Sequence, residues 1–223
     1  MKVVKLTKVD FHKILSIAER ILKSGGVVIA PTDTVYGILG DATRPEVIKK
    51  IFEMKGRPRE KALPIFIRDI AAARKYAYIS DAKARFLEKV WPGPVTVVFQ
   101  HKEKLPKILT GGLETIGIRI PNHQFLLELL YRLDFPLVQT SANISGQPPA
   151  KNLKEIKEYF DKNIITLRRE HMRTTRIDLV IDGGEILKQQ STAIDFTGKE
   201  PLILRTGVLS KAELDQLLSS VRV

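Results

Sequence analysis

The sequence lacks cysteine and has no long apolar run. None of its 223 residues is cysteine, which excludes disulfides, thiol nucleophiles and cysteine-ligated metals. No apolar stretch approaches the length of a membrane-spanning helix. The first residues, Met1 to Lys8, are too few and too charged for a signal peptide. These absences predict a cytoplasmic protein.

Standard phosphate-binding loops and metal motifs are also missing. Neither Gly-x-x-x-x-Gly-Lys-Ser/Thr nor Gly-x-Gly-x-x-Gly occurs in the chain. The four histidines, His12, His101, His123 and His171, are scattered without the spacing of metal ligands. We therefore expect them at surface or capping positions and predict no protein-held metal.

The charge is strongly unbalanced. Lysine and arginine total 37 against 25 acidic residues, which gives a formal net charge of +12. This excess favours anionic partners such as nucleotides, polyphosphates or RNA. The alternative is a generally basic surface that binds none of them.

A short apolar run followed by polar residues organises the chain. Val27 to Ala30 lies between Gly25-Gly26 and Pro31, a pattern typical of a buried strand. Four hydrogen-bonding side chains follow on a turn: Thr32, Asp33, Thr34 and Tyr36. Such a turn can bind a small polar ligand, or it can be an Asx-type turn whose polar groups satisfy only the local backbone.

Apolar periodicity and capping signals predict the helices. Asp10 precedes a helix that ends at Gly25, and Thr43 with Pro45 starts a second. Further helices are expected from Ser80 to Val90, Pro121 to about Leu133, and Asn152 to Phe160. The pair Ser210 and Glu213 forms a capping box for the last helix.

Strand signals outnumber the helices. The expected strands are Lys2–Leu6 (an edge strand), Val27–Ala30, Leu63–Ile67, Val95–Phe99, Ile116–Ile120, Leu137–Thr140, Asp178–Ile181, Thr192–Phe196 and Leu202–Leu204. They are not strictly alternating, so we predict an α/β fold with a mixed, twisted sheet and packed helices. We see no linker or repeat and expect one domain over residues 1–223. Residues 161–176 form a basic, poorly patterned segment with Arg168, Arg169, Arg173 and Arg176.

Cationic and hydroxyl residues stand at the edges of the predicted strands. The candidates are Lys55, Arg57, Arg119, Ser141, Asn143, Ser191 and Arg205. Arg119 interrupts the run Ile-Gly-Ile-Arg-Ile, so it either faces solvent or needs an anionic partner. If these loops converge, they form a cleft suited to a nucleoside triphosphate together with a small carboxylate. The fixed positive charges and the orientation of the two substrates would then promote the reaction without a protein nucleophile.

Six motifs closely resemble those of threonylcarbamoyl-AMP synthases, the YrdC-type family. In order they are Pro31–Gly37, Lys55–Pro58, Gly117–Pro121, Thr140–Gly146, Ser191–Asp195 and Leu204–Gly207. The resemblance implies an open α/β fold with a twisted sheet and a large positively charged cleft. It also implies that L-threonine, bicarbonate and ATP, with Mg²⁺ accompanying the ATP, are joined into threonylcarbamoyl-AMP and diphosphate. A transferase complex then passes the group to adenosine beside the anticodon of certain tRNAs.

The resemblance also implies a role for each candidate. Lys55 and Arg57 hold the ATP phosphates and are the catalytic residues. The nucleotide side further comprises Thr115, Ser141, Asn143 and Arg205. The threonine side comprises Thr32, Thr34, Tyr36, Arg119, which pairs with the threonine carboxylate, and Ser191.

The chain departs from the family pattern in a few places. Ala62 stands where many members have proline, and Phe66 stands where some have a histidine of the amino-acid pocket. These departures bear on threonine recognition more than on nucleotide binding. The family's long forms carry an additional C-terminal domain, whereas this chain resembles the short form.

Two other functions remain open on the sequence. The first is a non-catalytic protein of the same fold that binds double-stranded RNA or tRNA through phosphate contacts. The second is a paralogue that makes carbamoyl-adenylate in hydrogenase maturation, although the zinc-finger cysteines of those larger proteins are absent.

Overall fold

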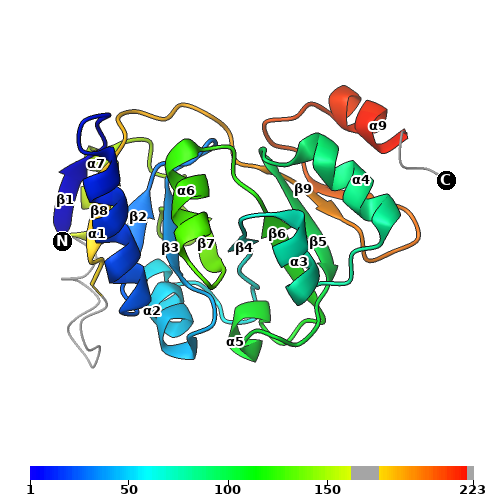
Figure 1. The fold of residues 1–223 in the computed structure, drawn as a ribbon, viewed down its shortest axis with the longest axis horizontal. Coiled ribbons are helices and arrows are strands. Elements are labelled where there is room, and N and C mark those ends of the chain that lie inside the picture. Colours follow the sequence, from blue (N-terminus) through cyan, green and yellow to red (C-terminus); the bar gives the residue numbers. More distant parts are fainter. Residues whose placement is uncertain (162–175, 220–223) are drawn as a thin grey trace.

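The computed structural model describes residues 1–161 and 176–219, which form a mixed sheet covered by helices (Figure 1). Its ten strands lie in the order β1-β8-β2-β3-β7-β4-β6-β5-β9-β10. The strands are β1 (Lys2–Lys5), β2 (Val28–Ala30), β3 (Gly37–Asp41), β4 (Ile65–Phe66), β5 (Val95–Gln100), β6 (Thr115–Arg119), β7 (Leu137–Ser141), β8 (Leu179–Asp182), β9 (Thr192–Asp195) and β10 (Leu202–Arg205). The helices are α1 (Phe11–Lys23), α2 (Pro45–Lys55), α3 (Ile70–Tyr76), α4 (Asp81–Val90), α5 (Lys107–Thr110), α6 (Gln124–Arg132), α7 (Leu153–Phe160) and α9 (Lys211–Ser219).

The sheet contains both parallel and antiparallel strand pairs. Strand β2 pairs parallel with β8 and antiparallel with β3, and β5 pairs antiparallel with β6 and parallel with β9. Strands β1 and β10 form the two edges. The predicted α/β fold with an open, mixed sheet is therefore confirmed.

Helices pack on both faces of the sheet. Val28 and Ile29 are neighbours on β2 and point to opposite faces. Val28 packs in one apolar cluster with α1 and α6, while Ile29 packs in a second cluster with α2. Figure 1 shows α1 and α6 lying over β2, β3 and β7. The layer made by α1 and α6 thus covers only one part of its face.

Local signals predict several helix ends correctly. Ser80 and Asn152 each accept a backbone N–H at the start of α4 and α7. Ser210 and Glu213 exchange hydrogen bonds in the expected capping box, with Ser210 N–H donating to Glu213 Oε2 at 2.8 Å. Asp10 occupies the N-cap position of α1, but its side chain makes no capping bond.

Strand β3 is missing from the prediction, and its glycines explain why. Gly37 and Gly40 weaken the strand signal, because glycine is depleted in strands. In the folded chain a Cβ on Gly40 would lie 2.5 Å from Cγ1 of Val47 on α2. Glycine therefore lets α2 pack directly against the strand, which is a tertiary requirement rather than a local one.

Other boundaries also differ from the expectation. Helices α3 and α5 are unpredicted, β4 is shorter than Leu63–Ile67, and α6 begins at Gln124 rather than Pro121. Most of the basic segment 161–176, including Arg168, Arg169 and Arg173, lies outside the described residues.

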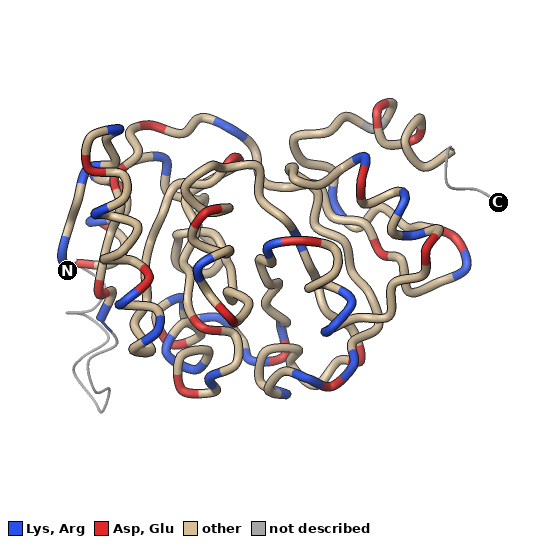
Figure 2. The backbone as a smooth tube through the Cα atoms, in the orientation of Figure 1, with Lys and Arg blue, Asp and Glu red and all other residues tan. Residues whose placement is uncertain are grey.

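Basic residues are spread over the described part of the chain. Figure 2 shows lysine and arginine interspersed with acidic residues along helices and loops. This distribution fits the generally basic surface that the composition left open. Across residues 1–161 and 176–219, no helix combines the length and the apolar content that crossing a membrane requires.

Candidate active site

A cavity of about 530 Å³ lies on the sheet, on the face that α3 and α4 do not cover. Along β5, Thr96 and Val98 line the cavity, whereas the alternating residues Val95, Val97 and Phe99 pack in the core with α3 and α4. The cavity floor is therefore formed by outward-facing positions of the sheet. Its walls come from the loops after β2 and α2, from the end of β7 and from the loop before β9.

Seven of the predicted site residues line this one cavity. They are Thr34, Arg57, Thr115, Arg119, Ser141, Ser191 and Arg205. They come from segments far apart in the sequence, so the sheet brings them together as the sequence argument required. Lys55, Asn143, Thr32 and Tyr36 lie outside the lining.

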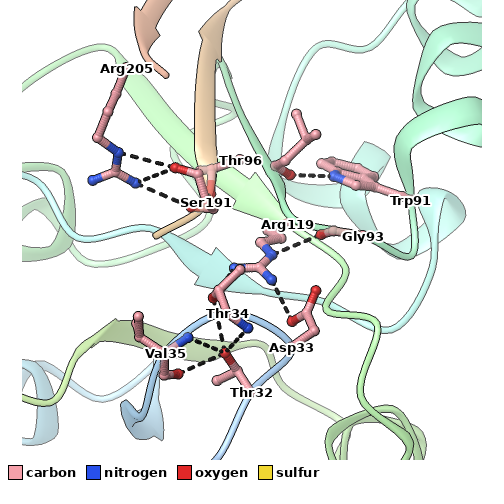
Figure 3. Close-up of polar contacts among 11 residues, drawn as sticks. Thr32, Asp33, Thr34, Val35, Trp91, Gly93, Thr96, Arg119, Ser191 and Arg205 are labelled. Atoms are coloured by element: carbon pink, nitrogen blue, oxygen red, sulfur yellow. Dashed lines mark hydrogen bonds and ion pairs between the residues drawn. The ribbon is translucent and has the colours of Figure 1, made fainter. Parts of the chain in front are cut away.

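Arg119 on β6 is buried and held from three directions (Figure 3). Its Nε donates to the Gly93 carbonyl oxygen at 2.9 Å, its Nη1 donates to Thr34 Oγ1 at 3.1 Å, and its Nη2 pairs with Asp33 Oδ1. Burial lowers the pKa of Arg119, and the Asp33 carboxylate opposes that shift. Of the two alternatives from the sequence, the anionic partner is the one observed.

Arg205 organises the wall of the cavity around Ser191. Figure 3 shows its guanidinium directed at Ser191. Its Nη2 donates to the Ser191 carbonyl oxygen at 2.8 Å and to Ser191 Oγ at 3.2 Å. Ser191 Oγ also shares a hydrogen bond of 2.9 Å with Thr96 Oγ1. The result is a connected hydrogen-bond network that joins β5, the residue before β9 and β10.

Arg57 lies in the loop after α2. Its Nε and Nη2 donate to the carbonyl oxygens of Lys61 and Ala62, each at 3.0 Å. These bonds hold the loop closed around the guanidinium, which lines the cavity beside Ala62. Burial lowers the pKa of Arg57.

Lys55 lies beneath the cavity wall with only 2% of its surface exposed. Its Nζ donates to the carbonyl oxygens of Ser141 at 2.5 Å and Asn143 at 2.9 Å, and to Asn143 Oδ1 at 2.9 Å. Ser141 Oγ in turn donates to Asn143 Oδ1 at 2.6 Å. Desolvation, with a smaller contribution from Arg57, lowers the pKa of Lys55 to about 7.

Thr32 and Tyr36 serve the backbone around the cavity. Thr32 Oγ1 donates to the Val35 carbonyl oxygen at 2.7 Å and accepts the Thr34 N–H at 3.0 Å, as in the local turn considered from the sequence. Tyr36 donates to the Gly184 carbonyl oxygen at 2.6 Å and accepts the Gly183 N–H at 2.9 Å. Tyr36 thereby anchors the start of the segment that connects β8 with β9.

Several lining residues are not among the sequence candidates. They include Thr96, Leu113, Gln139, Gln190, Asp195 and Leu204. Asp195 carries the one carboxylate among the described residues that line the cavity. Asp195 could have been found as part of the Ser191–Asp195 motif, and Thr96 as the single hydroxyl within an apolar strand.

Comparisons with known proteins agree with this architecture. The Sua5_yciO_yrdC family model, described as telomere recombination, matches residues 20–207. The threonylcarbamoyl-AMP synthase of Pyrococcus abyssi is 34% identical over 211 residues, which cover 94% of this chain and 58% of the relative. The putative threonylcarbamoyl-AMP synthase of Methanocaldococcus jannaschii is 32% identical over 210 residues, with 94% and 93% of the two chains covered.

A solved structure shares the fold. The crystal structure of P. abyssi Sua5 complexed with L-threonine matches with a TM-score of 0.87 at 32% identity, covering 100% of this chain and 62% of that one. The chain thus spans little more than half the length of the Pyrococcus relative. Since the family model accounts for residues 20–207, the chain belongs to the Sua5/YciO/YrdC family.

Proposed function

We propose that this chain is a threonylcarbamoyl-AMP synthase, a nucleotidyltransferase that uses L-threonine, bicarbonate and ATP. The threonine nitrogen bonds to the bicarbonate carbon with loss of water, which gives a carbamate. A carbamate oxygen then attacks the α-phosphorus of ATP, and the bond to the β-phosphate breaks to release diphosphate. Relatives that carry this name support the proposal.

The lining of the cavity is the observation that carries this proposal. The lining contains three arginines, Arg57, Arg119 and Arg205, and one aspartate, Asp195; Asp33 outside the lining pairs with Arg119, so a net positive charge remains. Two anionic reactants repel each other, so fixed guanidinium groups lower the cost of bringing them together. A volume of about 530 Å³ is in the range of ordinary small-molecule sites.

The geometry suggests which residues serve each substrate. Arg57 and Arg205 have no carboxylate partner within residues 1–161 and 176–219 and suit the phosphates of ATP. Ser141 and Thr115 line the cavity and complete the nucleotide side. Lys55 acts from behind Ser141, where it fixes the loop through Asn143 and can take up a proton when ATP binds.

Arg119 is assigned to the carboxylate of threonine. Thr34 lies beside it in the lining, and Ser191 completes this side of the cavity. Thr32 supports Thr34 through its hydroxyl, 3.0 Å away, and Tyr36 supports the segment that precedes Ser191. P. abyssi Sua5 binds L-threonine in the related structure, which supports an amino-acid subsite here.

Magnesium fits this site as a companion of ATP. No group of three or more histidine, aspartate or glutamate side chains that could hold a metal occurs in the described residues. Asp195 supplies one carboxylate in the cavity, and Mg²⁺ is commonly bound by one or two carboxylates together with substrate phosphates. Mg²⁺ would neutralise charge on the departing diphosphate.

Diphosphate release tests the proposal directly. The protein is incubated with ATP and bicarbonate, with and without L-threonine, and diphosphate is measured. Threonine-dependent release supports the synthase. RNA retention at physiological salt without such release would instead support the non-catalytic RNA- or tRNA-binding protein.

Two variants examine the phosphate side. We expect Lys55→Ala and Arg57→Ala to abolish turnover while the circular dichroism spectrum stays that of the wild type. Arg59→Ala, an exposed arginine outside the cavity lining, is the matched control and should retain activity. Wild-type rates in either test variant would remove that residue from the site. The product would be passed to tRNA by a transferase complex, as the family resemblance implies.

A further inference from the structure

The three cavity arginines differ in how their charge is balanced. Nη2 of Arg119 pairs with the Asp33 carboxylate, and the two side chains are 2% and 9% exposed. Within the described residues, the hydrogen-bond acceptors of Arg57 and Arg205 are carbonyl oxygens, a hydroxyl and an amide oxygen, and none is a carboxylate. Of the three cavity arginines, Arg119 is therefore charge-compensated and the other two are not.

Asp33 also fixes the orientation of Arg119. Each guanidinium nitrogen of Arg119 donates one hydrogen bond, to Gly93, Thr34 and Asp33 respectively. Its guanidinium carbon lies 5.4 Å from the centre of the Phe66 ring. Because Nη1 and Nη2 each carry a second hydrogen, the guanidinium keeps donors for a ligand while its plane is held.

The Asp33 carboxylate has binding capacity left over. Its Oδ2 is buried and finds no hydrogen-bond partner among the described residues, and neither does Nδ1 of His123. A carboxylate that served only to stabilise the fold would normally have both oxygens satisfied. Here the only hydrogen bond of the carboxylate within the described residues is the one that Asp33 Oδ1 accepts from Nη2 of Arg119.

We propose that Asp33 is a positioning residue that sorts the two anionic substrates of the cavity, an inference that rests on the proposed function. By compensating Arg119, Asp33 makes that guanidinium a poor site for phosphate groups of high charge. The guanidinium remains a directed donor for the single carboxylate of an amino acid. The polyphosphate of ATP then binds Arg57 and Arg205, which have no carboxylate partner within the described residues.

Inhibition by inorganic phosphate provides the test. In the wild type we expect phosphate to compete with ATP and not with threonine. In Asp33→Asn the buried Arg119 loses its counter-charge, so phosphate should become competitive with threonine. The KM for threonine should rise about tenfold while the KM for ATP changes by less than about twofold. A merely structural defect would lower kcat through the active fraction and leave the inhibition pattern unchanged.

Asp41→Asn is the matched control. Asp41 is also a buried carboxylate, 3.1 Å from Nε of Arg44, but it lies outside the cavity lining. This variant also removes an ion pair between an arginine and a buried aspartate, with Arg44 41% exposed, and its inhibition pattern should remain that of the wild type. The inference is overturned if Asp33→Asn behaves like Asp41→Asn in both KM values and in the competition pattern.

A second variant covers a failure of Asp33→Asn to fold. Asp33→Glu keeps the charge and displaces it by one methylene group. In this variant phosphate should still compete with ATP and not with threonine, as in the wild type, while the KM for threonine rises. An unchanged KM for threonine would contradict the positioning role.

A failure of the proposed function would look different. The wild type itself would then release no diphosphate in response to threonine. Calorimetric titration with inorganic phosphate would still decide the role of Asp33. We expect Asp33→Asn to bind one more phosphate than the wild type, at Arg119, and equal stoichiometries would overturn the inference.

Discussion

Replacing Lys55 with methionine isolates the electrostatic cost of burying an ammonium group beside the cavity. Lys55 is 2% exposed, and burial lowers its pKa from 10.5 to about 7. Methionine has a similar length without the charge, so the difference between the two proteins reports on that proton. The free energy of unfolding, measured in urea at several pH values, is the quantity to compare.

The sign of the effect follows from proton binding. Above pH 10.5 neither the folded nor the unfolded state carries the Lys55 proton, and below about pH 7 both carry it. Between these values only the unfolded state holds the proton, so stability rises with pH. From pH 7 to pH 9 the wild type should gain about 2 kcal/mol relative to Lys55→Met.

An exposed lysine on the same helix supplies the control. Lys49 is 56% exposed, and Lys49→Met should follow the pH dependence of the wild type. If the free energy of unfolding changes equally with pH in the wild type and in Lys55→Met between pH 7 and pH 9, Lys55 stays charged throughout. The reasoning from burial would then be refuted.

The same proton should respond to the nucleotide. Negative phosphate charge near Lys55 favours its charged form, so ATP binding near pH 8 should take up a proton. Calorimetry in two buffers with different ionisation enthalpies measures this uptake. Lys55→Met should bind ATP without it, and equal proton uptake in both proteins would place the titrating group elsewhere.

Three further substitutions probe the site and the fold. Arg205→Ala should raise the KM for ATP about tenfold and the KM for threonine much less, because it removes a charge-assisted donor; equal effects on both KM values would contradict this assignment. Gly40→Ala should cost about 1–3 kcal/mol in urea unfolding, because its Cβ would meet Val47, and wild-type stability would show that α2 can shift. Ser210→Ala should cost about 0.5–2 kcal/mol by removing the capping box with Glu213, seen as faster hydrogen exchange in α9.

Local chemistry explains what could be predicted from the sequence alone. Periodicity and caps predict α1, α4 and α7, because a helix depends on residues three or four positions apart. Six short motifs indicate the family and contain six of the seven candidate residues that line the cavity, all except Thr115. In each case the decisive information lies within one continuous segment.

Tertiary structure decides how the motif residues divide their roles. Asp33 and Arg119 are 86 residues apart, and no local pattern pairs them. No local pattern predicts the hydrogen bond from Lys55 to Ser141, or the one between Tyr36 and Gly183. Side chains one position apart on a strand face opposite ways, so only the register of the sheet determines which of them reach the cavity.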